Sequence, residues 1–550
     1  MKRHILLSVL VLQSILIFGQ ISSKEKDFTI YYNNNNNIEL QFESPVIAKA
    51  YGGIYNKEVS LNYNDNNGHI YNIVNAEPST IIRLDYQSIT DENKSLQTAY
   101  IATPSKSTGT IDVYFNHPVD TSYSQGQNAV NLGNTLDEKL ISYTNSTSIS
   151  LDIAIYNSYS PSSILGIVGA INNAYDRGVQ VRVIYDGSTG STMIPLLNSL
   201  IPRLASPNNS NYGIMHNKFV IFDANSTDEN KPIVWTGSTN WTIAQIDGPD
   251  KNSAIVIQDK SLALGYQIEF DEMWGSTTST PIPFNSRFGP YKLDNTPHTY
   301  NIGGKIVNSY FSPSDGTTSK IIDIINSADT DINVATMLIT RTDISSALIN
   351  KYNNGLSSTQ LIMDTQNPQG NQKPLLLTEI GSSRVRTDTS SGVMHHKFMV
   401  VDNYNSSSDP SVLIGSHNWS SAAENKNDEN TLIIHDLNIS NQYYQAFAFL
   451  YKLSGGVITN PLAVIENQLV QNNYTIYPNP SSGIFNIRSN TIIVGNYDVR
   501  IYDATGKHII QESWDSSKTK RVDLTLQPIG IYFVVITDGS IVNLIKVIKN

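Results

Sequence analysis

One short pattern of reactive residues occurs twice in this 550-residue chain. The first copy places His216 two residues before Lys218, and the second places His395 two residues before Lys397; both follow the pattern HxKxxxxD. Each copy is followed downstream by a Gly-Ser-x-Asn-Trp pentad. A lone His-x-Lys arises by chance on any exposed strand, but two copies with the same downstream pentad do not. The repeat therefore predicts one site built from both copies.

The two copies together supply the groups needed for in-line attack on a phosphodiester. Histidine has an unperturbed pKa of about 6.5, so one ring can act as a neutral nucleophile while the other is a protonated acid. Two close imidazoles also push their pKa values apart. One histidine would form a covalent phosphohistidine, and the other would protonate the leaving alcohol and then activate water. The non-bridging oxygens would be held by Lys218, Lys397, Asn240 and Asn418. Because these fixed cations balance the phosphate charge, we expect no cofactor and no metal ion.

The flanking residues predict how the motifs are positioned. In a β-strand, residues i and i+2 point to the same face, so the histidine and lysine of each motif should project together. The runs 219–222 and 398–401 are apolar and β-favouring, as in a buried sheet. A βαβ rhythm precedes both motifs. We expect strands at 111–115, 151–156 and 177–186 with a helix near 163–175 before the first motif. Before the second motif we expect strands at 306–311, 332–335 and 360–364 with a helix near 344–352.

These residues resemble the phospholipase D superfamily, whose signature is the duplicated HxKxxxxD followed by GSxN. The resemblance implies an α/β fold of two sandwich lobes, here residues 108–290 (lobe 1) and 300–455 (lobe 2), related by pseudo-twofold symmetry with both motifs at the interface. By this analogy His216 is the nucleophile and His395 the general acid/base. Supporting roles fall to the motif aspartates and the pentad hydroxyls, which are Asp223, Asp402, Ser238 and Ser416.

The resemblance also implies a carboxylate, after the GSxN turn, that orients a motif histidine. Glu429 is the candidate in the second repeat. The first repeat departs from the pattern, because Lys251 stands where Glu429 sits, with Asp250 as a substitute. Further candidates at the expected edge of the sheets are Asp186 and Asp364, and two motif histidines, His396 and His417, either touch substrate or face solvent.

The two ends of the chain predict export. Residues 1–20 combine a basic start, an apolar run from Ile5 to Phe18 and a short polar end, which is typical of a signal peptide. An uncleaved anchor is the alternative, although the run is shorter than the roughly twenty residues that a membrane helix needs. The chain contains no cysteine, so its stability outside the cell must come from packing rather than from disulfides.

After an expected linker at 456–473, residues 474–550 predict a small all-β domain. Their order of YPNP, IYDxxGK, GIYxV and a lysine-rich last strand resembles the C-terminal sorting domain of the type IX secretion system of certain Gram-negative bacteria. The resemblance implies that the type IX machinery is a partner and that the protein is secreted or held at the cell surface.

Residues 21–105 alternate apolar and polar side chains, which predicts a β-sandwich-like accessory module. The segments 81–86 and 99–104 resemble late strands of a fibronectin type III module. The module is either a spacer or a binding element for a surface glycan or lipid.

Composition bears on the substrate. The formal net charge is −11, and outside the motifs no lysine or arginine run of the kind that grips duplex DNA is present. We therefore expect a secreted phospholipase D-type phosphoric diester hydrolase that acts on phospholipid head groups at a membrane surface. Two alternatives stay open: a metal-independent endonuclease with nucleic acid as substrate, and a catalytically inactive surface binding protein. Because one chain carries both motifs, we expect a monomer.

Overall fold

The structure is a computed structural model, and it describes residues 21–33, 37–52, 57–63, 69–74, 76–90, 95–159, 161–404, 408–458, 474–489, 496–503, 507–515, 519–537 and 542–550. The predicted signal peptide and most of the predicted linker lie outside these residues. The chain divides into two compact units, Met1–Ile458 and Thr459–Asn550. In the described part of the chain, no helix is both long enough and apolar enough to cross a membrane.

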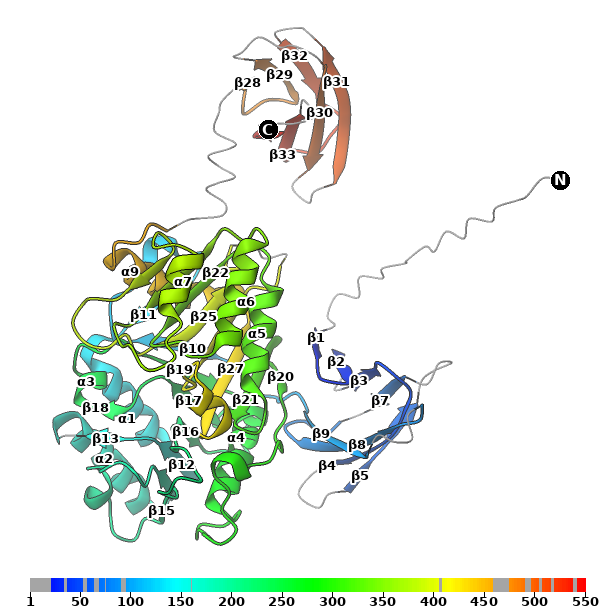
Figure 1. Cartoon of the computed structure of the whole chain (residues 1–550). Coiled ribbons are helices and arrows are strands. Elements are labelled where there is room, and N and C mark those ends of the chain that lie inside the picture. The colour runs from blue at the N-terminus through cyan, green and yellow to red at the C-terminus, as the bar shows by residue number, and fades with distance from the viewer. Residues whose placement is uncertain are drawn as a thin grey trace. The chain divides into compact units, whose positions relative to one another are not determined.

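Each lobe is built on an eight-stranded mixed sheet (Figure 1). In lobe 1 the order is β11 (Val130–Asn131), β10 (Ile111–Phe115), β19 (Ser253–Gln258), β17 (Ile233–Gly237), β16 (Lys218–Phe222), β12 (Ser150–Ile155), β14 (Gln180–Tyr185) and β15 (Arg203–Ala205). In lobe 2 it is β20 (Thr299–Ile302), β21 (Lys305–Ser312), β27 (Glu429–His435), β26 (Ser411–Gly415), β25 (Lys397–Val401), β22 (Ile332–Thr336), β23 (Thr359–Met363) and β24 (Val385–Thr387). After the first edge strand, both sheets follow the same order and the same directions.

Helices cover both faces of the sheets. Lobe 1 contributes α1 (Leu136–Ser146), α2 (Pro161–Asp176), α3 (Ile243–Ile246) and α4 (Lys260–Trp274), and lobe 2 contributes α5 (Thr317–Ser327), α6 (Thr342–Asn353), α7 (Lys373–Glu379), α8 (Ser421–Asn425) and α9 (Leu437–Leu453). Helices α1 and α2 close the outer core of lobe 1, and α5 and α6 close that of lobe 2 (Figure 1). Helices α4 and α9 pack into a third core that both lobes share.

Strand β16 shows why the motif strands are apolar without alternation. Phe219 and Ile221 enter the core shared by the lobes, whereas Val220 and Phe222 enter the outer core of lobe 1. A strand that is buried on both faces needs apolar residues at every position. The predicted α/β fold with two similar lobes is confirmed.

The N-terminal module is a two-sheet β-sandwich with one shared core. Its sheets have the orders β1-β2-β3-β7-β6 and β5-β4-β8-β9. If β2 to β9 are taken as strands A, B, C, C′, D, E, F and G, this is an immunoglobulin-like arrangement. The strands are β1 (Ile21–Lys24), β2 (Phe28–Asn33), β3 (Asn37–Phe42), β4 (Val46–Gly52), β5 (Lys57–Val59), β6 (Leu61–Tyr63), β7 (Ile70–Ile73), β8 (Ile81–Ser88) and β9 (Gln97–Ala102). The fibronectin type III assignment stays a prediction.

The C-terminal unit is all-β, as predicted. Its two antiparallel sheets have the orders β28-β29-β32 and β31-β30-β33-β34, and their apolar residues form one core. The strands are β28 (Tyr474–Tyr477), β29 (Ile484–Ser489), β30 (Asn496–Asp503), β31 (His508–Asp515), β32 (Thr519–Asp523), β33 (Gly530–Thr537) and β34 (Val542–Lys549).

Candidate active site

Each motif histidine is held by the backbone of the opposite lobe. The His216 N–H donates to the Asp428 carbonyl at 2.9 Å, and the His395 N–H donates to the Lys251 carbonyl at 3.0 Å. Strands β16 and β25 consequently begin at the lysine of each motif, whereas the sequence predicted that histidine and lysine share one strand face. The histidines leave the sheets because their backbones pair across the interface. These reciprocal backbone hydrogen bonds bring the two motifs together around a pseudo-twofold axis.

Glu429 contacts His216 across the interface. Its Oε2 lies 2.6 Å from Nδ1 of the ring, and the carboxylate also accepts a hydrogen bond from the Ser416 hydroxyl. Burial raises the pKa of Glu429 to about 7, so the group is ionised above neutral pH. As a carboxylate it only accepts, so Nδ1 then carries the proton and Nε2 keeps a lone pair. Burial, with the charges of Lys218 and Lys397, lowers the pKa of His216 well below its usual value. The Nε2 atom is therefore unprotonated at neutral pH.

The counterpart of Glu429 in lobe 1 is Asn252, which corrects the sequence prediction. Asn252 Oδ1 lies 2.9 Å from Nδ1 of His395 and also accepts a hydrogen bond from the Ser238 hydroxyl at 3.0 Å. Lys251 instead pairs with Asp388 at 3.0 Å, and Asp250 accepts a backbone N–H from Val393. Neither residue contacts His395 in the way that Glu429 contacts His216, so the second histidine faces a neutral amide.

Lys218 and Lys397, the lysines of the two motifs, are both buried. Their side chains donate to the carbonyls of His216 and His395, each at 2.7 Å. Within the described residues, no carboxylate lies at ion-pair distance from either ammonium. Burial lowers the pKa of Lys218 to about 7, and burial together with the Lys218 charge lowers that of Lys397 well below its usual value. The site therefore contains two lysines whose positive charge is costly to bury without a nearby anion.

The pentads frame these cations. Ser238 Oγ accepts the Ser253 N–H at 3.2 Å, and Ser416 Oγ accepts the Asn430 N–H at 3.0 Å, so each hydroxyl fastens its pentad to the following strand. The side-chain carbonyls of Asn240 and Asn418 are buried without a hydrogen-bond partner. Both carboxamides therefore retain hydrogen-bonding capacity.

The motif aspartates lie away from the histidines and tie down loops. Asp223 accepts the backbone N–H groups of Ser148, Ile149 and Ser150 at 3.1, 2.7 and 3.0 Å. Asp402 accepts those of Asp329 and Thr330 at 2.8 and 2.7 Å. Each aspartate fastens the turn before a central strand of its lobe.

The further candidates from the sequence are structural neighbours of the motifs. Asp186 and Asp364 accept the Met215 and Met394 N–H groups, each at 2.8 Å, and so support the chain just before each histidine. His396 and His417 are buried, which excludes one of the two alternatives, that they face solvent.

His396 lies against a residue that the sequence did not single out. Its Nε2 is 2.7 Å from Nε2 of His117, whose Nδ1 lies 2.8 Å from the Pro118 carbonyl. Burial lowers the pKa of both rings, so they form a neutral pair that joins the lobes.

A tyrosine in lobe 1 makes the site asymmetric. The Tyr156 ring centroid is 4.7 Å from the His216 ring centroid. Lys218 Nζ lies 5.2 Å from the same Tyr156 centroid. Tyr156 donates its N–H to the first motif at Asn217, and the equivalent position in lobe 2 is Met337. Tyr156 and Glu429 therefore both contact His216. No pattern in the sequence indicates this role for Tyr156.

Comparisons with known proteins agree with this geometry. The family described as "Cardiolipin synthase, PLD-like domain" matches residues 140–274 and 321–451, one segment in each lobe. Residues 475–550 match a secretion system C-terminal sorting domain. The chain therefore carries a duplicated phospholipase D-like domain. It ends in a type IX sorting domain, which directs a protein to the secretion machinery for release or display at the cell surface.

Individual relatives cover only parts of the chain. A mitochondrial cardiolipin hydrolase from Drosophila melanogaster is 33% identical over 159 residues, 26% of this chain and 60% of the fly protein. A phospholipase D from Rickettsia typhi is 27% identical over 151 residues, 28% of this chain and 70% of that protein. The crystal structure of Nuc, a phospholipase D family member from Salmonella typhimurium, is 26% identical, covers 27% of this chain and 94% of its own, and has a TM-score of 0.24.

Proposed function

We propose that the chain is a secreted, metal-independent phospholipase D-type phosphodiesterase that hydrolyses phospholipid head-group esters through a phosphohistidine. The observation that carries this proposal is the buried pair Lys218 and Lys397, which are 3% and 2% exposed and lack a carboxylate partner in the described part of the chain. Burying an unpaired ammonium is costly, so a site that buries two is organised for an anion that arrives from outside.

The difference between Glu429 and Asn252 supports distinct roles for the histidines. Nε2 of His216 attacks phosphorus, and the carboxylate of Glu429 stabilises the imidazolium character that the ring gains as the P–N bond forms. The amide of Asn252 gives His395 no such charge stabilisation, so this ring releases its proton more readily. His216 is accordingly the nucleophile and His395 the acid/base.

The reaction proceeds in two balanced steps. In the first, the P–N bond to His216 forms, the P–O bond to the head-group alcohol breaks, and His395 gives its proton to the departing oxygen. In the second, neutral His395 takes a proton from water, whose oxygen attacks phosphorus and expels His216. The bound phosphodiester's negative charge counters the lysines, raising the pKa of His395 in the complex and allowing it to be the acid.

Lipid is the proposed substrate class for three reasons. The net charge of −11 and the lack of basic runs do not suit a protein that grips long nucleic acids. The matched family and the similar fly and Rickettsia proteins carry lipid-related names, two of them cardiolipin. Export by a sorting domain would bring the enzyme to membranes outside its own cytoplasm.

The experiment incubates the purified protein in EDTA with vesicles that contain phosphatidylcholine, phosphatidylethanolamine and cardiolipin, and in a parallel tube with plasmid DNA. Formation of phosphatidic acid or a phosphatidyl product from lipid, with intact plasmid, is expected. Degraded plasmid with untouched lipid would instead make the protein a nuclease.

Two variants test whether the site performs the hydrolysis. His216→Ala and His395→Ala should each abolish turnover of lipid, because each removes a reacting group. Wild-type turnover in both would refute the site, and a wild-type protein without activity on either substrate would favour a surface binding protein. Complete inhibition by EDTA that added metal reverses would refute the metal-free mechanism.

A further inference from the structure

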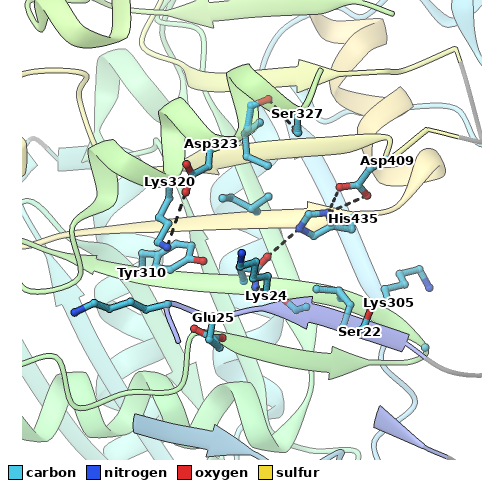
Figure 2. A pocket seen from close by; sticks show the side chains of 17 residues that line it. Ser22, Lys24, Glu25, Lys305, Tyr310, Lys320, Asp323, Ser327, Asp409 and His435 are labelled. Carbon is cyan, nitrogen blue, oxygen red and sulfur yellow. Dashed lines mark hydrogen bonds and ion pairs between the residues drawn. The ribbon is translucent and has the colours of Figure 1, made fainter. Parts of the chain in front are cut away.

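Four ionisable side chains from three separate parts of the chain converge outside the active site. Glu25 follows β1 of the N-terminal module, Asp294 and His298 lie in the segment that connects the lobes, and Asp315 lies between β21 and α5 of lobe 2. Glu25 also lines a cavity of about 760 Å³ between β1 and lobe 2 (Figure 2). None of the four residues belongs to the His–Lys motifs.

The distances in this cluster fit a shared ion. His298 Nε2 lies 3.1 Å from Asp294 Oδ1 and 3.5 Å from Asp315 Oδ2, and one ligand atom from each side chain lies within 4.8 Å of the others. Ligands at about 2.0–2.1 Å from a tetrahedral zinc ion are separated by about 3.3 Å. The two measured separations lie on either side of this value.

Nε2 of His298 lacks a well-formed hydrogen bond, and a bound metal ion would give this nitrogen a partner. His298 Nε2 is buried beside the carboxylates of Asp294 and Asp315, but neither contact has the geometry of a good hydrogen bond. Together with Glu25 these carboxylates raise the pKa of the ring well above its usual value, so a metal ion at Nε2 would replace the proton there. A single N–H at Nε2 can donate a good hydrogen bond to only one of the Asp294 and Asp315 carboxylates, whereas a metal ion can bind both. Lys292, whose charge acts on Asp315, is already paired with Glu269.

His435, on the same cavity, provides the contrast. Its Nδ1 lies 2.8 Å from Asp409, and its Nε2 lies 2.9 Å from the Asn308 side-chain carbonyl, so both ring nitrogens have hydrogen-bond partners (Figure 2). A partly exposed His–Asp pair in this protein is therefore satisfied without an ion, and the geometry around His298 is different.

We propose that His298 Nε2, Asp294 and Asp315 bind a structural Zn²⁺ ion. Imidazole nitrogen with carboxylate oxygens is a ligand set that suits zinc. Glu25 Oε2 lies 3.7 Å from His298 Nδ1, on the other side of the ring, where a carboxylate orients a metal-bound histidine. Asp315 keeps lone pairs for the ion while it accepts the Phe311 N–H at 2.7 Å. The Asp294 side chain is 52% exposed, which leaves a path for the ion and for a water ligand.

The ion would fasten the N-terminal module to the catalytic lobes. Direct contacts at this junction include the Tyr32 hydroxyl, which donates to the Thr299 carbonyl at 3.0 Å, and the Thr299 hydroxyl, which donates to Glu25 at 2.5 Å. A metal ion held by the connecting segment and by lobe 2 gains affinity from the folded arrangement and stabilises it in return, and Glu25 links the N-terminal module to the ion through the His298 ring. In an exported chain without cysteine, such an ion supplies the cross-link that a disulfide cannot.

The test measures zinc binding and thermal unfolding of the whole chain after treatment with a chelator and its removal. Zn²⁺ should bind with one ion per chain by calorimetry and should raise Tm by at least about 2 °C. No binding and no rise in Tm would overturn the proposal. A rise with Ca²⁺ but not with Zn²⁺ would also overturn it, because calcium selects oxygen ligands rather than imidazole.

Matched variants assign the effect to the cluster. His298→Asn should lose the zinc-dependent rise, whereas His435→Asn should keep it; the two side chains are similarly buried, 16% and 21% exposed. Asp294→Asn, at an exposed position, should weaken binding at least tenfold even if His298→Asn fails to fold. An undiminished response in Asp294→Asn would exclude the cluster. Lipid hydrolysis in EDTA should persist below the unfolding temperature, since the two sites share no residue.

Discussion

Glu429 of lobe 2 lies 2.6 Å from His216 of lobe 1, whereas Asn252, in the equivalent position of lobe 1, lies 2.9 Å from His395. A pseudo-twofold site thus contains one carboxylate-supported and one amide-supported histidine. The symmetry of the fold builds the site, and in the proposed mechanism this difference in residue type separates the roles of the two rings.

The carboxylate is expected to matter for the chemical step rather than for substrate binding. Glu429→Gln keeps the shape of the side chain but removes a charge-assisted hydrogen bond, worth about 1.5–3 kcal/mol. The value of kcat should fall about 10- to 150-fold, with KM changed little. Asn252→Asp is the matched variant, because it adds a carboxylate at the other histidine. A wild-type kcat in Glu429→Gln would rule out the assigned role.

Trapping the covalent intermediate can test which histidine is the nucleophile and which is the acid/base. A p-nitrophenyl phosphodiester has a leaving group that needs no acid, so His395→Asn should still form the intermediate but should not hydrolyse it. A stoichiometric burst of nitrophenolate is expected, with an acid-labile phosphoryl adduct on His216 detectable by mass spectrometry. His216→Asn should show no burst. A trapped adduct on His395 in His216→Asn would reverse the assignment.

The pH dependence of kcat/KM follows from the surroundings of His216. The ring must be neutral to attack, and burial together with the Lys218 and Lys397 charges lowers its pKa well below the usual value. Activity should therefore persist below pH 6.5 and fall only at lower pH. Removing the negative charge in Glu429→Gln destabilises the imidazolium, so it should move the acidic limb still lower. A limb at or above pH 6.5 in the wild type would contradict this electrostatic account.

The repeated motifs made the two lobes and the strands that begin at the motif lysines predictable from sequence. The partner of His395 was not predictable in this way, because Asn252 lies one residue further from its pentad than Glu429 lies from its own. Helices α4 and α9 begin at the capping residues Asp259 and Asp436. Counting back from these caps, rather than forward from the pentads, aligns Asn252 with Glu429.

Contacts between the lobes, and between the N-terminal module and the lobes, could not be predicted from the sequence for a different reason. The pairing of His117 with His396 and the convergence of Glu25 with His298 join residues far apart in the chain. Neither has a local pattern, since nothing in a strand or turn signal specifies which loops of two lobes meet. Such contacts follow only from the packing of complete lobes.

The motif aspartates should contribute to stability. Asp223 accepts three backbone N–H groups and has a φ of 51°, in the left-handed region. Asp223→Ala leaves these donors unpaired and puts alanine in an unfavourable conformation, so it should lower the unfolding free energy by at least about 2 kcal/mol. Asp223→Asn keeps one acceptor and should cost less. Urea unfolding measures the difference, and equal stability of the alanine variant and the wild type would contradict the assignment.

A buried carboxyl near the second motif aspartate should make stability depend on pH. Burial and the Asp402 charge raise the pKa of Asp331 to about 7, far above its value in an unfolded chain. The folded state then binds a proton that the unfolded state has lost, so stability present below about pH 4 declines as pH rises to about 7. Asp331→Asn removes the charge that is costly to bury and should raise Tm at pH 8, by the equivalent of about 2 kcal/mol, but hardly at pH 4. The neighbouring exposed Asp329→Asn is the control and should change Tm little at either pH. A gain for Asp331→Asn that is equal at pH 4 and pH 8 would mean that packing, rather than the buried charge, is responsible.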